Sequence, residues 1–555
     1  MELTTAMTGV LPFIILVSSP LTMIFSVFLL WLYRRAVIRS MRGNGGSSMP
    51  DEVAGAKVSA QESPPLRIRL IKDKVLLHGR AESAFNATSV SLQRLGLVYG
   101  VAGVVYALVM SLPWMITAGG GFPLVRLLWL FVCFAWPGVI VVVMAAATSS
   151  GQKQLIFTGY FLFVVLIGVV VIARNSDSSV GQLLFFWLFA NGAPTLLLVT
   201  YFLRRIRAVG PLVLTFMVAG VTGAVVLTTI VGNSETMLSA FTGIGVFLGL
   251  GAIPMYVMIN LLGFLLFGIF GWWLLGRLGY AYRAKRMSDQ SLNLDALWLM
   301  FAVFQSITLA FEGGMWIFTG LVAFIIYKQI TRIGFTRVKS QIYSKRAPSL
   351  LLLRVFALGR KSERMFDTLS KRWLRHGNID MIAGPSLVTS TIEPHEFLDY
   401  MGGHLSRSFI DNPSVLEQRL ALRDCLPDPD GRYRVNEFFC RNDTWQMCMS
   451  RLASESDVVL MDLRSFSQQN QGCLWELEQL LTTVLLDRVL FVVDETTDKG
   501  FLEQQLQRLW KRVPGNSPNL GLEKPQVNLL SVQASIPKVA DQLTKRLFEA
   551  SYQTE

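Results

Sequence analysis

Hydrophobic positions along this chain follow two different patterns. Up to about residue 340 they form long apolar runs, most of which approach or exceed the roughly 20 residues that a helix needs to cross a bilayer. Eight of these runs occupy residues 10–33, 95–116, 124–147, 155–173, 183–203, 212–231, 292–311 and 315–330. Beyond about residue 348 the apolar runs become short and alternate with segments of helical spacing. We therefore predict a polytopic helical membrane domain followed by a soluble α/β domain.

A ninth apolar stretch, residues 238–275, is too long for one helix and is interrupted at Gly249, Gly251 and Pro254. It ends at a basic cluster around Arg283, and basic loops favour the cytoplasmic side of a membrane. Those charges reach the cytoplasm only if the stretch crosses an odd number of times. We predict one crossing plus a re-entrant or interfacial piece. The total is then nine spans in the cell (inner) membrane, with the N-terminus outside and the C-terminal domain in the cytoplasm.

The pattern divides the chain into four parts. Residues 1–39 should form an uncleaved membrane anchor, because the basic residues follow its apolar core, whereas a signal peptide carries them in front. Residues 40–92 should be a cytoplasmic linker, partly disordered, since its first half is rich in Gly, Ser and Pro. The basic segment 67–85 within it is expected to be a solvated loop, or alternatively to lie along the inner membrane surface. Residues 93–340 should hold the other spans, and residues 345–555 the cytoplasmic domain.

Residues 456–498 form the clearest unit of the soluble half. The runs DVVLMDL and DRVLFVVD have the length of strands buried on both faces, and CLWELEQLLTTVLL between them has helical spacing. Two such strands joined by a helix make a parallel βαβ unit. Further strands are predicted at 350–356, 379–383, 432–439 and 527–532, and helices at 363–375, 394–408, 443–454, 502–513 and 538–550. Residues 412–431 resemble an insertion that ends in a turn, and Asp443 is expected to cap the next helix. The alternation predicts a doubly wound α/β domain.

Charge and composition narrow the functional classes. The chain has 555 residues, is 52% hydrophobic and carries a formal net charge of +13. Its first 344 residues hold 25 Lys and Arg against 11 Asp and Glu, whereas residues 345–555 hold 26 against 27. Basic loops at a membrane explain this excess, and nucleic-acid binding is not expected because the soluble half has no basic patch with interleaved aromatic residues. Five cysteines without a CxxC motif and four scattered histidines indicate neither a disulfide framework nor a metal site.

Polar residues follow both strands of the central βαβ unit. Asp462 and Arg464 come after the first strand, Asp494 follows the second, and Glu476 lies in the first turns of the connecting helix. Parallel sheets bind ligands beyond the carboxyl ends of their strands, so this edge is the predicted site. The sequence contains no phosphate-binding GxxxxGK[ST] loop, no GxGxxG fingerprint after the first strand and no GxSxG nucleophile elbow.

The segment NQGCLWEL resembles the signature of TIR domains, in which an aromatic residue, a Cys and then Glu-Leu open the helix after the third strand. Cys473, Glu476 and Leu477 match it, whereas Gly472 stands where many members have tryptophan and Trp475 lies beside the glutamate. VFALGRKSERMF is similar to the strand, loop and helix start that open such a domain, without the usual Asp-Val-Phe-Ile-Ser core. The resemblance covers roughly residues 349–550 and implies a flavodoxin/TIR-like fold.

Catalytic TIR domains cleave the N-glycosidic bond of NAD, and the resemblance assigns the essential carboxylate to Glu476. Such a carboxylate stabilises the oxocarbenium-like centre left when nicotinamide departs. The residues expected to line the cleft or bind the dinucleotide are Phe356, Arg360, Ser386, Asp462, Arg464 and Trp475. NAD would be a substrate, and no permanently bound cofactor is implied.

Three functional hypotheses remain open. The first is a membrane-anchored signalling or defence protein of bacterial type whose TIR-like domain hydrolyses NAD. The second is a non-catalytic scaffold of the same fold that self-associates through helix faces and the loop 384–386. The third is a transporter or channel with a nucleotide-responsive regulatory domain. Ionisable residues at mid-membrane depth are typical of transporters, and none of Arg126, Asp295 and Glu312 is clearly placed there. The lipid bilayer is the expected partner in all three.

Overall fold

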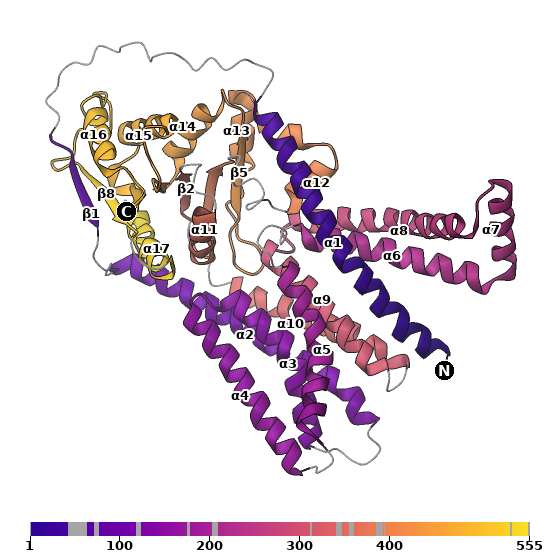
Figure 1. Ribbon diagram of the computed structural model, residues 1–555. Helices are drawn as coiled ribbons and strands as arrows, with labels where there is room; N and C mark the ends of the chain where they lie inside the picture. The colour runs from indigo at the N-terminus through magenta and orange to yellow at the C-terminus, as the bar shows by residue number, and fades with distance from the viewer. Residues whose placement is uncertain are drawn as a thin grey trace.

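The computed structural model describes residues 2–42, 64–71, 77–117, 124–174, 178–201, 209–310, 314–339, 347–354, 360–383, 392, 394–532 and 536–552. Long helices make up one part of the molecule, and an α/β unit on one parallel sheet makes up the other (Figure 1). The N-terminus lies at the end of the first helix that is remote from the α/β unit, and the C-terminus lies in that unit.

Nine helices in the described part of the chain are long and apolar enough to cross a membrane, as expected of a multi-pass membrane protein and in agreement with the predicted number. They are α1 (Glu2–Arg42), α2 (Gly79–Ile116), α3 (Leu124–Ala146), α4 (Ser150–Arg174), α5 (Val180–Tyr201), α6 (Gly210–Asn233), α8 (Ala252–Arg283), α9 (Asp289–Ala310) and α10 (Thr319–Lys339). Leu155 on α4 and Phe185 on α5 are 74% and 70% exposed, which suits side chains that face lipid.

The long apolar stretch 238–275 resolves into two helices of unequal length. α7 (Glu235–Phe247) has 13 residues, too few to span a bilayer, and α8 has 32. The chain turns between them at Gly249, which has a φ of +66°, a conformation that glycine adopts without steric cost. The prediction of one crossing helix and one short piece is confirmed at the level of helix lengths.

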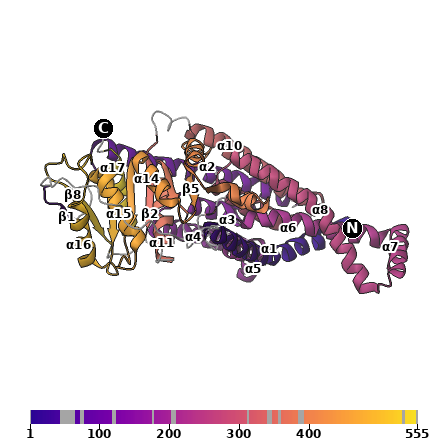
Figure 2. The same ribbon diagram turned by 90° about the horizontal axis from the view of Figure 1, so that it is seen from above.

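The helices form a bundle and an arm. α2, α3, α4, α5, α9 and α10 pack together below the sheet, whereas α6, α7 and α8 project to one side with α7 at the tip (Figures 1 and 2). α6 and α8 approach so closely that a Cβ atom on Gly263 would overlap the carbonyl oxygen of Gly223. Small residues of this kind let helix backbones pack tightly in membranes.

One eight-stranded sheet forms the centre of the α/β unit. Its strands are β1 (Arg67–Ile71), β2 (Ser349–Arg354), β3 (Asn378–Ile382), β4 (Phe409–Ile410), β5 (Val435–Cys440), β6 (Val458–Asp462), β7 (Val489–Val493) and β8 (Gln526–Ser531). The spatial order is β1-β8-β7-β6-β2-β3-β5-β4, and every neighbouring pair is parallel. The predicted central unit is present as β6 and β7, with Val459 opposite Val489.

The strand order places the reversal of the winding between β2 and β6. Without the edge strands β1 and β4, the order from one edge is the third, second, first, fourth, fifth and sixth strand of the C-terminal half. This is the order of dinucleotide-binding doubly wound sheets, whereas flavodoxin-like sheets have the order 2-1-3-4-5. Short buried strands have similar patterns whichever neighbours they take, so the sequence pattern did not distinguish the two orders.

Helices cover both faces of the sheet, as a doubly wound domain requires. α13 (Pro413–Ala421), α14 (Trp445–Glu455), α15 (Gln471–Thr483) and α16 (Lys499–Trp510) pack on one face. α11 (Arg360–Trp373) and α17 (Ile536–Tyr552) pack on the other, together with Phe85 near the start of α2. α12 (Pro394–Met401) instead packs beside α1, α6 and α8. The described residues also include three short 3-10 helices: η1 (Gly314–Phe318), η2 (Leu405–Ser408) and η3 (Leu486–Arg488).

The basic segment expected to be a solvated loop contributes a strand. Residues 67–71 form β1, which pairs in parallel with β8 and closes that edge of the sheet. Leu66 and Ile71 are buried, and the carbonyl of Leu66 accepts a hydrogen bond of 2.9 Å from the side chain of Gln507 on α16. Alternating arginine and apolar residues suit an edge strand, because charged side chains discourage pairing with further strands.

Two smaller expectations about the C-terminal half also change. The segment 412–431, interpreted as an insertion, contains α13. Asp443 does not cap the following helix, since α14 begins after Thr444. The Thr444 hydroxyl accepts from the backbone N–H of Arg441 at 3.0 Å and donates to the carbonyl of Ile410 at 2.7 Å, so it ties this helix start to β4.

Candidate functional site

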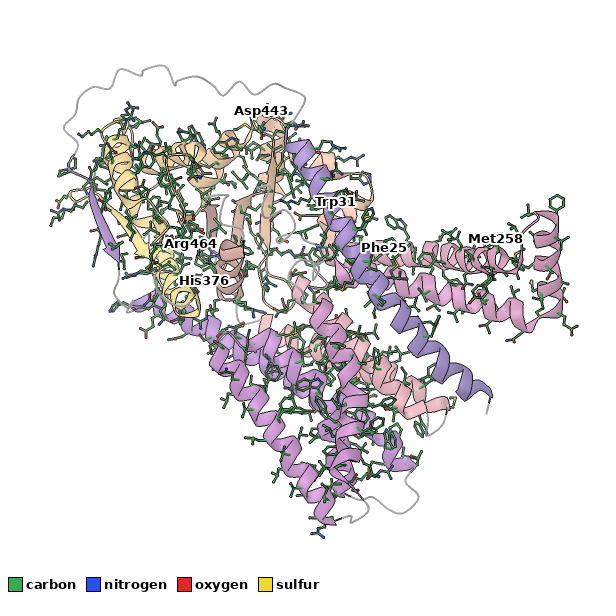
Figure 3. The ribbon with its side chains drawn as sticks, in the orientation of Figure 1. Phe25, Trp31, Met258, His376, Asp443 and Arg464 are labelled. Atoms are coloured by element: carbon green, nitrogen blue, oxygen red, sulfur yellow. The ribbon has the colours of Figure 1, made fainter. Side chains whose placement is uncertain are left out.

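Asp462 and Arg464 lie at the predicted edge, where β6 ends, and they bind each other. Arg464 donates from Nε and Nη2 to the two carboxylate oxygens of Asp462, each at 2.7 Å, and both residues are buried. Arg464 lies inside the α/β unit (Figure 3). A fork-to-fork pair of this kind is strong and directional. The pair therefore fixes the turn after β6.

The loops after β6 and β7 are joined by hydroxyl groups. Ser465 has a positive φ of 59°, and its backbone N–H donates to the Thr496 hydroxyl at 3.0 Å. Thr496 in turn donates to Asp494 at 2.6 Å. Thr496 is exposed, and Ser465 and Asp494 are half-buried, beside the buried Asp462–Arg464 pair. The edge thus presents hydroxyl and carboxylate groups on a rigid frame, close to the point where the winding reverses.

Glu476 lies on α15, and its side chain is only 5% exposed. Its Oε2 has no hydrogen-bond partner among the described residues. Burial raises the pKa of Glu476 to about 8, so this carboxyl group is mostly protonated at neutral pH. Burial also raises the pKa of Cys473, one turn earlier, to about 12. The resemblance to TIR domains implies an ionised carboxylate that faces an open cleft, and the buried surroundings of Glu476 are the opposite of that.

The remaining residues of the predicted site are Trp475, Phe356, Ser386 and Arg360. Trp475 packs edge-to-face on Trp445 of α14, with ring centroids 5.1 Å apart, and so belongs to the interface between two helices. Phe356 and Ser386 lie outside the described residues, and Arg360 is described only as the first residue of α11. Of the predicted set, the structure brings Asp462 and Arg464 into contact.

A second polar site, which the sequence analysis did not identify, lies where the α/β unit meets the membrane helices. A pocket of about 220 Å³ opens there between the end of α8 and the strand β5. Four arginines and four acidic residues line it: Arg283, Arg419, Arg423, Arg434, Glu396, Asp399, Asp424 and Glu437. The balanced charges indicate an ionic junction. We use the name junction for this pocket and the ion pairs beside it.

Arg434 at the start of β5 is the central residue of the junction. It donates to both carboxylate oxygens of Asp428, at 2.7 Å from Nη2 and 3.0 Å from Nε. Nη2 also donates to the carbonyl of Tyr282 in α8 at 2.8 Å, and the guanidinium stacks 3.8 Å from the Tyr282 ring centroid. Burial raises the pKa of Asp428 to about 7, while Arg434 acts in the opposite direction. One side chain thus joins a domain loop to the last turn of a membrane helix.

A second buried arginine makes a parallel connection to the start of α9. Arg375, after α11, donates to Gln290 at 3.0 Å and to the backbone carbonyl of Asp430. The Asp430 carboxylate accepts from the hydroxyl of Ser288 at 2.8 Å. Arg375, Asp430 and Ser288 are all buried. The connection between α8 and α9 is therefore held from both sides by groups of the α/β unit.

The network continues into the sheet through Asp380 on β3. Its carboxylate accepts from Arg423 at 3.1 Å and from the amides of Asn378 and Asn436, each at 2.8 Å. Arg423 also donates to Glu455 at 3.1 Å. Burial raises the pKa of Asp380, and the contact with Arg423 lowers it. Polar groups of β3, β5 and α14 are thereby linked to the junction.

Sequence reasoning missed the junction because its residues are spread over 282–290, 375–399 and 419–455. The available signal was the run RDCLPDPDGRYR, which contains three aspartates and three arginines within twelve residues. We interpreted residues 423–431 as the end of an insertion and residues 432–434 as the start of a strand. Among the described residues, no group of three or more His, Cys, Asp or Glu side chains is arranged to hold a metal ion.

The comparisons with known proteins identify no relative. No protein-family model matches the chain, and no curated protein or solved structure is significantly similar to it. The resemblance to TIR domains therefore depends on the residues quoted above, chiefly Cys473, Glu476 and Leu477. The fold and the two polar sites carry the functional argument.

Proposed function

We propose that this chain is a membrane-embedded signalling protein in which the cytoplasmic α/β domain and the membrane helices change conformation together. The observation that carries the proposal is the junction, where Arg434 binds Asp428 of the domain and Tyr282 of α8. A domain that was merely anchored would need no buried charges at this interface. Membrane tethers ordinarily end in a polar, flexible linker.

Buried ion pairs make such an interface sensitive to position. A charge removed from water is stabilised only while its partners stay in place, so a small displacement favours a discrete new set of contacts over a gradual one. Arg434 and Arg375 both contact the segment 282–290 between α8 and α9. A shift of β3 or β5 would consequently move the domain-side ends of two membrane helices.

The proposed signal is a nucleotide bound beyond the carboxyl ends of β2 and β6. Sheets with this strand order bind nucleotides at the point where the winding reverses. The exposed hydroxyl of Thr496, the half-buried hydroxyl of Ser465 and the carboxylate of Asp494 are suited to ribose and amino groups. NAD is one of the nucleotides that this proposal allows, and no permanently bound cofactor is proposed.

Hydrogen exchange of the full-length protein in detergent tests the coupling. NAD, ATP and GTP are added separately, and exchange is followed at two places: the loops 463–470 and 494–498, and the connection 284–288. A signalling nucleotide should protect the loops and also alter exchange at the connection. In the variant Arg434→Met, protection of the loops should persist and the change at the connection should disappear. If none of the three nucleotides protects the loops, the proposed nucleotide binding is refuted. If a nucleotide still alters exchange at the connection 284–288 in Arg434→Met, the proposed role of the junction is refuted.

A catalytic role for Glu476 remains a separate prediction, tested by NAD consumption in the same preparation. The buried, protonated side chain favours the non-catalytic alternative. We expect no NAD loss above that of buffer. NAD turnover that is absent in Glu476→Gln would instead identify a hydrolase with this residue at its centre. Self-association through the domain stays a prediction of the sequence.

Transport by the membrane half has less support. A buried row of polar side chains crosses the bundle, in which Tyr106 donates to Gln305 at 2.8 Å and Gln305 donates to Asn191 at 2.9 Å. Asn191 then donates to the carbonyl of Cys133 at 3.1 Å. Each amide in this row is satisfied by its neighbours, which is typical of groups that hold membrane helices together.

A further inference from the structure

Two large apolar side chains of the α/β unit are exposed, and both belong to one short segment. Leu422 and Leu426 are 77% and 62% exposed, and no other large hydrophobic side chain among the described residues 347–552 is exposed. The segment 422–426 follows α13 and leads back toward β5. Exposed leucines on an otherwise polar surface indicate a place where the domain meets another apolar surface.

The segment is held against the end of α8. The Nζ group of Lys285 donates to the carboxylate of Asp424 and to the backbone carbonyl of Leu426. Arg434 approaches the same carboxylate, with its Nη1 3.6 Å from Oδ2 of Asp424. The acidic residue of the segment is therefore neutralised, and the leucines are fixed beside the point where a membrane helix ends.

The last turns of α8 carry the side chains that are typical of a membrane–water interface. Trp273 and Tyr280 are exposed. Arg277 and Arg286 lie over these rings, 5.8 Å and 5.6 Å from their centroids. Aromatic and basic residues gather where hydrocarbon gives way to headgroups. Since Tyr280 lies less than one turn before α8 ends, we expect the segment 422–426 at the level of the headgroups.

Backbone groups of the segment are already paired within the protein. The N–H groups of Leu422 and Arg423 donate to carbonyls of α13 at 3.1 Å and 3.2 Å. The N–H of Asp424 donates to the side-chain oxygen of Asn436 at 2.9 Å, and that of Leu426 donates to the Asp424 carboxylate at 3.3 Å. Backbone that has its partners in place loses less on leaving water than unpaired backbone does.

We propose that Leu422 and Leu426 insert into the leaflet on the domain side and hold the α/β domain on the membrane surface. The bilayer is the apolar surface within their reach, because the segment adjoins the end of a membrane helix. Side chains at such a surface are buried about 5–10 Å into the boundary between headgroups and acyl chains. The insertion supports the junction from the lipid side, since the same segment carries Asp424 to Lys285.

A fluorescent label on Cys425, between the two leucines, tests the insertion. Cys425 is exposed and the other cysteines of the chain are buried, so an NBD iodoacetamide labels it selectively. The full-length protein is reconstituted in phosphatidylcholine nanodiscs. The quenchers are a phosphatidylcholine with a nitroxide near the top of its acyl chain, and aqueous iodide. We expect the lipid quencher to reduce the emission at least about twofold more than iodide does, because the label lies at the headgroup boundary.

Two variants serve as controls. In Cys425→Ser with Gln504→Cys the label is on α16, which lies on the side of the α/β unit remote from the membrane helices (Figure 1), so iodide should be the stronger quencher. Leu422→Ser with Leu426→Ser keeps the label at Cys425 and should lose most of the lipid quenching. Its melting temperature should match that of the parent, because both leucines are exposed.

Three results would overturn the proposal. The first is equal quenching by the lipid nitroxide at positions 425 and 504. The second is unchanged lipid quenching in the variant that lacks both leucines, since the leucines would then not hold the segment in the leaflet. The third is protection of the label at Cys425 from both quenchers, which would show that a second copy or another protein covers the leucines.

Discussion

Replacing Arg434 by methionine is the most direct perturbation of the junction. Methionine keeps much of the length and apolar character of the arginine stem and removes the guanidinium. The substitution leaves the Asp428 carboxylate, whose side chain is 2% exposed, without its bidentate partner. It also removes the hydrogen bond to the carbonyl of Tyr282 and the stacking on its ring.

The magnitude follows from the burial of the pair. Deleting one partner of a buried ion pair costs about 3–5 kcal/mol, because the remaining charge stays desolvated. For a domain of this size that loss corresponds to a fall of about 10 °C in melting temperature. Removing both charges in Arg434→Met with Asp428→Leu should restore most of the loss, since no unpaired charge then remains.

The assay is thermal unfolding of the full-length protein in detergent, followed by near-ultraviolet circular dichroism. The matched control is Arg451→Gln on α14. Arg451 also binds two carboxylates, those of Glu417 and Glu455, but its side chain is 42% exposed. A solvated pair in that position contributes little to stability, so the control should melt close to the parent.

Two outcomes would refute this reasoning. Arg434→Met could melt as the control does, in which case the junction does not stabilise the contact between domain and helices. The double variant could alternatively be as unstable as the single one. The loss would then come from packing against Tyr282 and not from the uncompensated charge of Asp428.

Three further predictions concern the core and the arm. In Glu476→Gln the melting temperature should depend less on pH between 5 and 8.5 than in the parent. The pKa of Glu476 is about 8 in the folded protein against 4.5 ordinarily, so stability is full below pH 4.5 and falls by on the order of 4 kcal/mol as pH rises to 8. Gly263→Ala should lower the melting temperature, at a cost of about 1–3 kcal/mol, because its Cβ overlaps the backbone of Gly223, whereas Gly276→Ala on the same helix meets nothing within 4 Å. Asn519→Ala should cost about 2–3 kcal/mol in the same assay, because its buried amide serves Leu481, Val484 and Leu486.

Each of these has a result that contradicts it. A pH profile shared by the parent and Glu476→Gln would mean that the carboxyl group is solvated. Equal melting of the two glycine variants would mean that α6 and α8 do not pack at Gly263. Parental stability of Asn519→Ala would mean that water replaces its three hydrogen bonds.

Local pattern by itself predicted the long apolar helices and six of the eight strands, whereas β1 and β4 were not predicted. A run of apolar residues long enough to span a bilayer has few alternatives to a helix, because every backbone group must find its partner within the segment. The break at Gly249 and the two strands around Asp462 were therefore predictable from short stretches of sequence. The change in run length likewise predicted a division at about residue 345, although the strand at 67–71 also belongs to the sheet of the α/β unit.

Only the tertiary structure decided which elements are neighbours. The segment at 67–71 pairs with β8, more than 450 residues later in the chain, because an exposed strand edge is covered by whichever strand reaches it. Burial of Glu476, invisible in its helix pattern, comes from the way α15 packs on the sheet. Arg434, Asp428 and Tyr282 meet for the same reason: long-range packing sets their distances and the desolvation of their charges, and no local signal encodes either quantity.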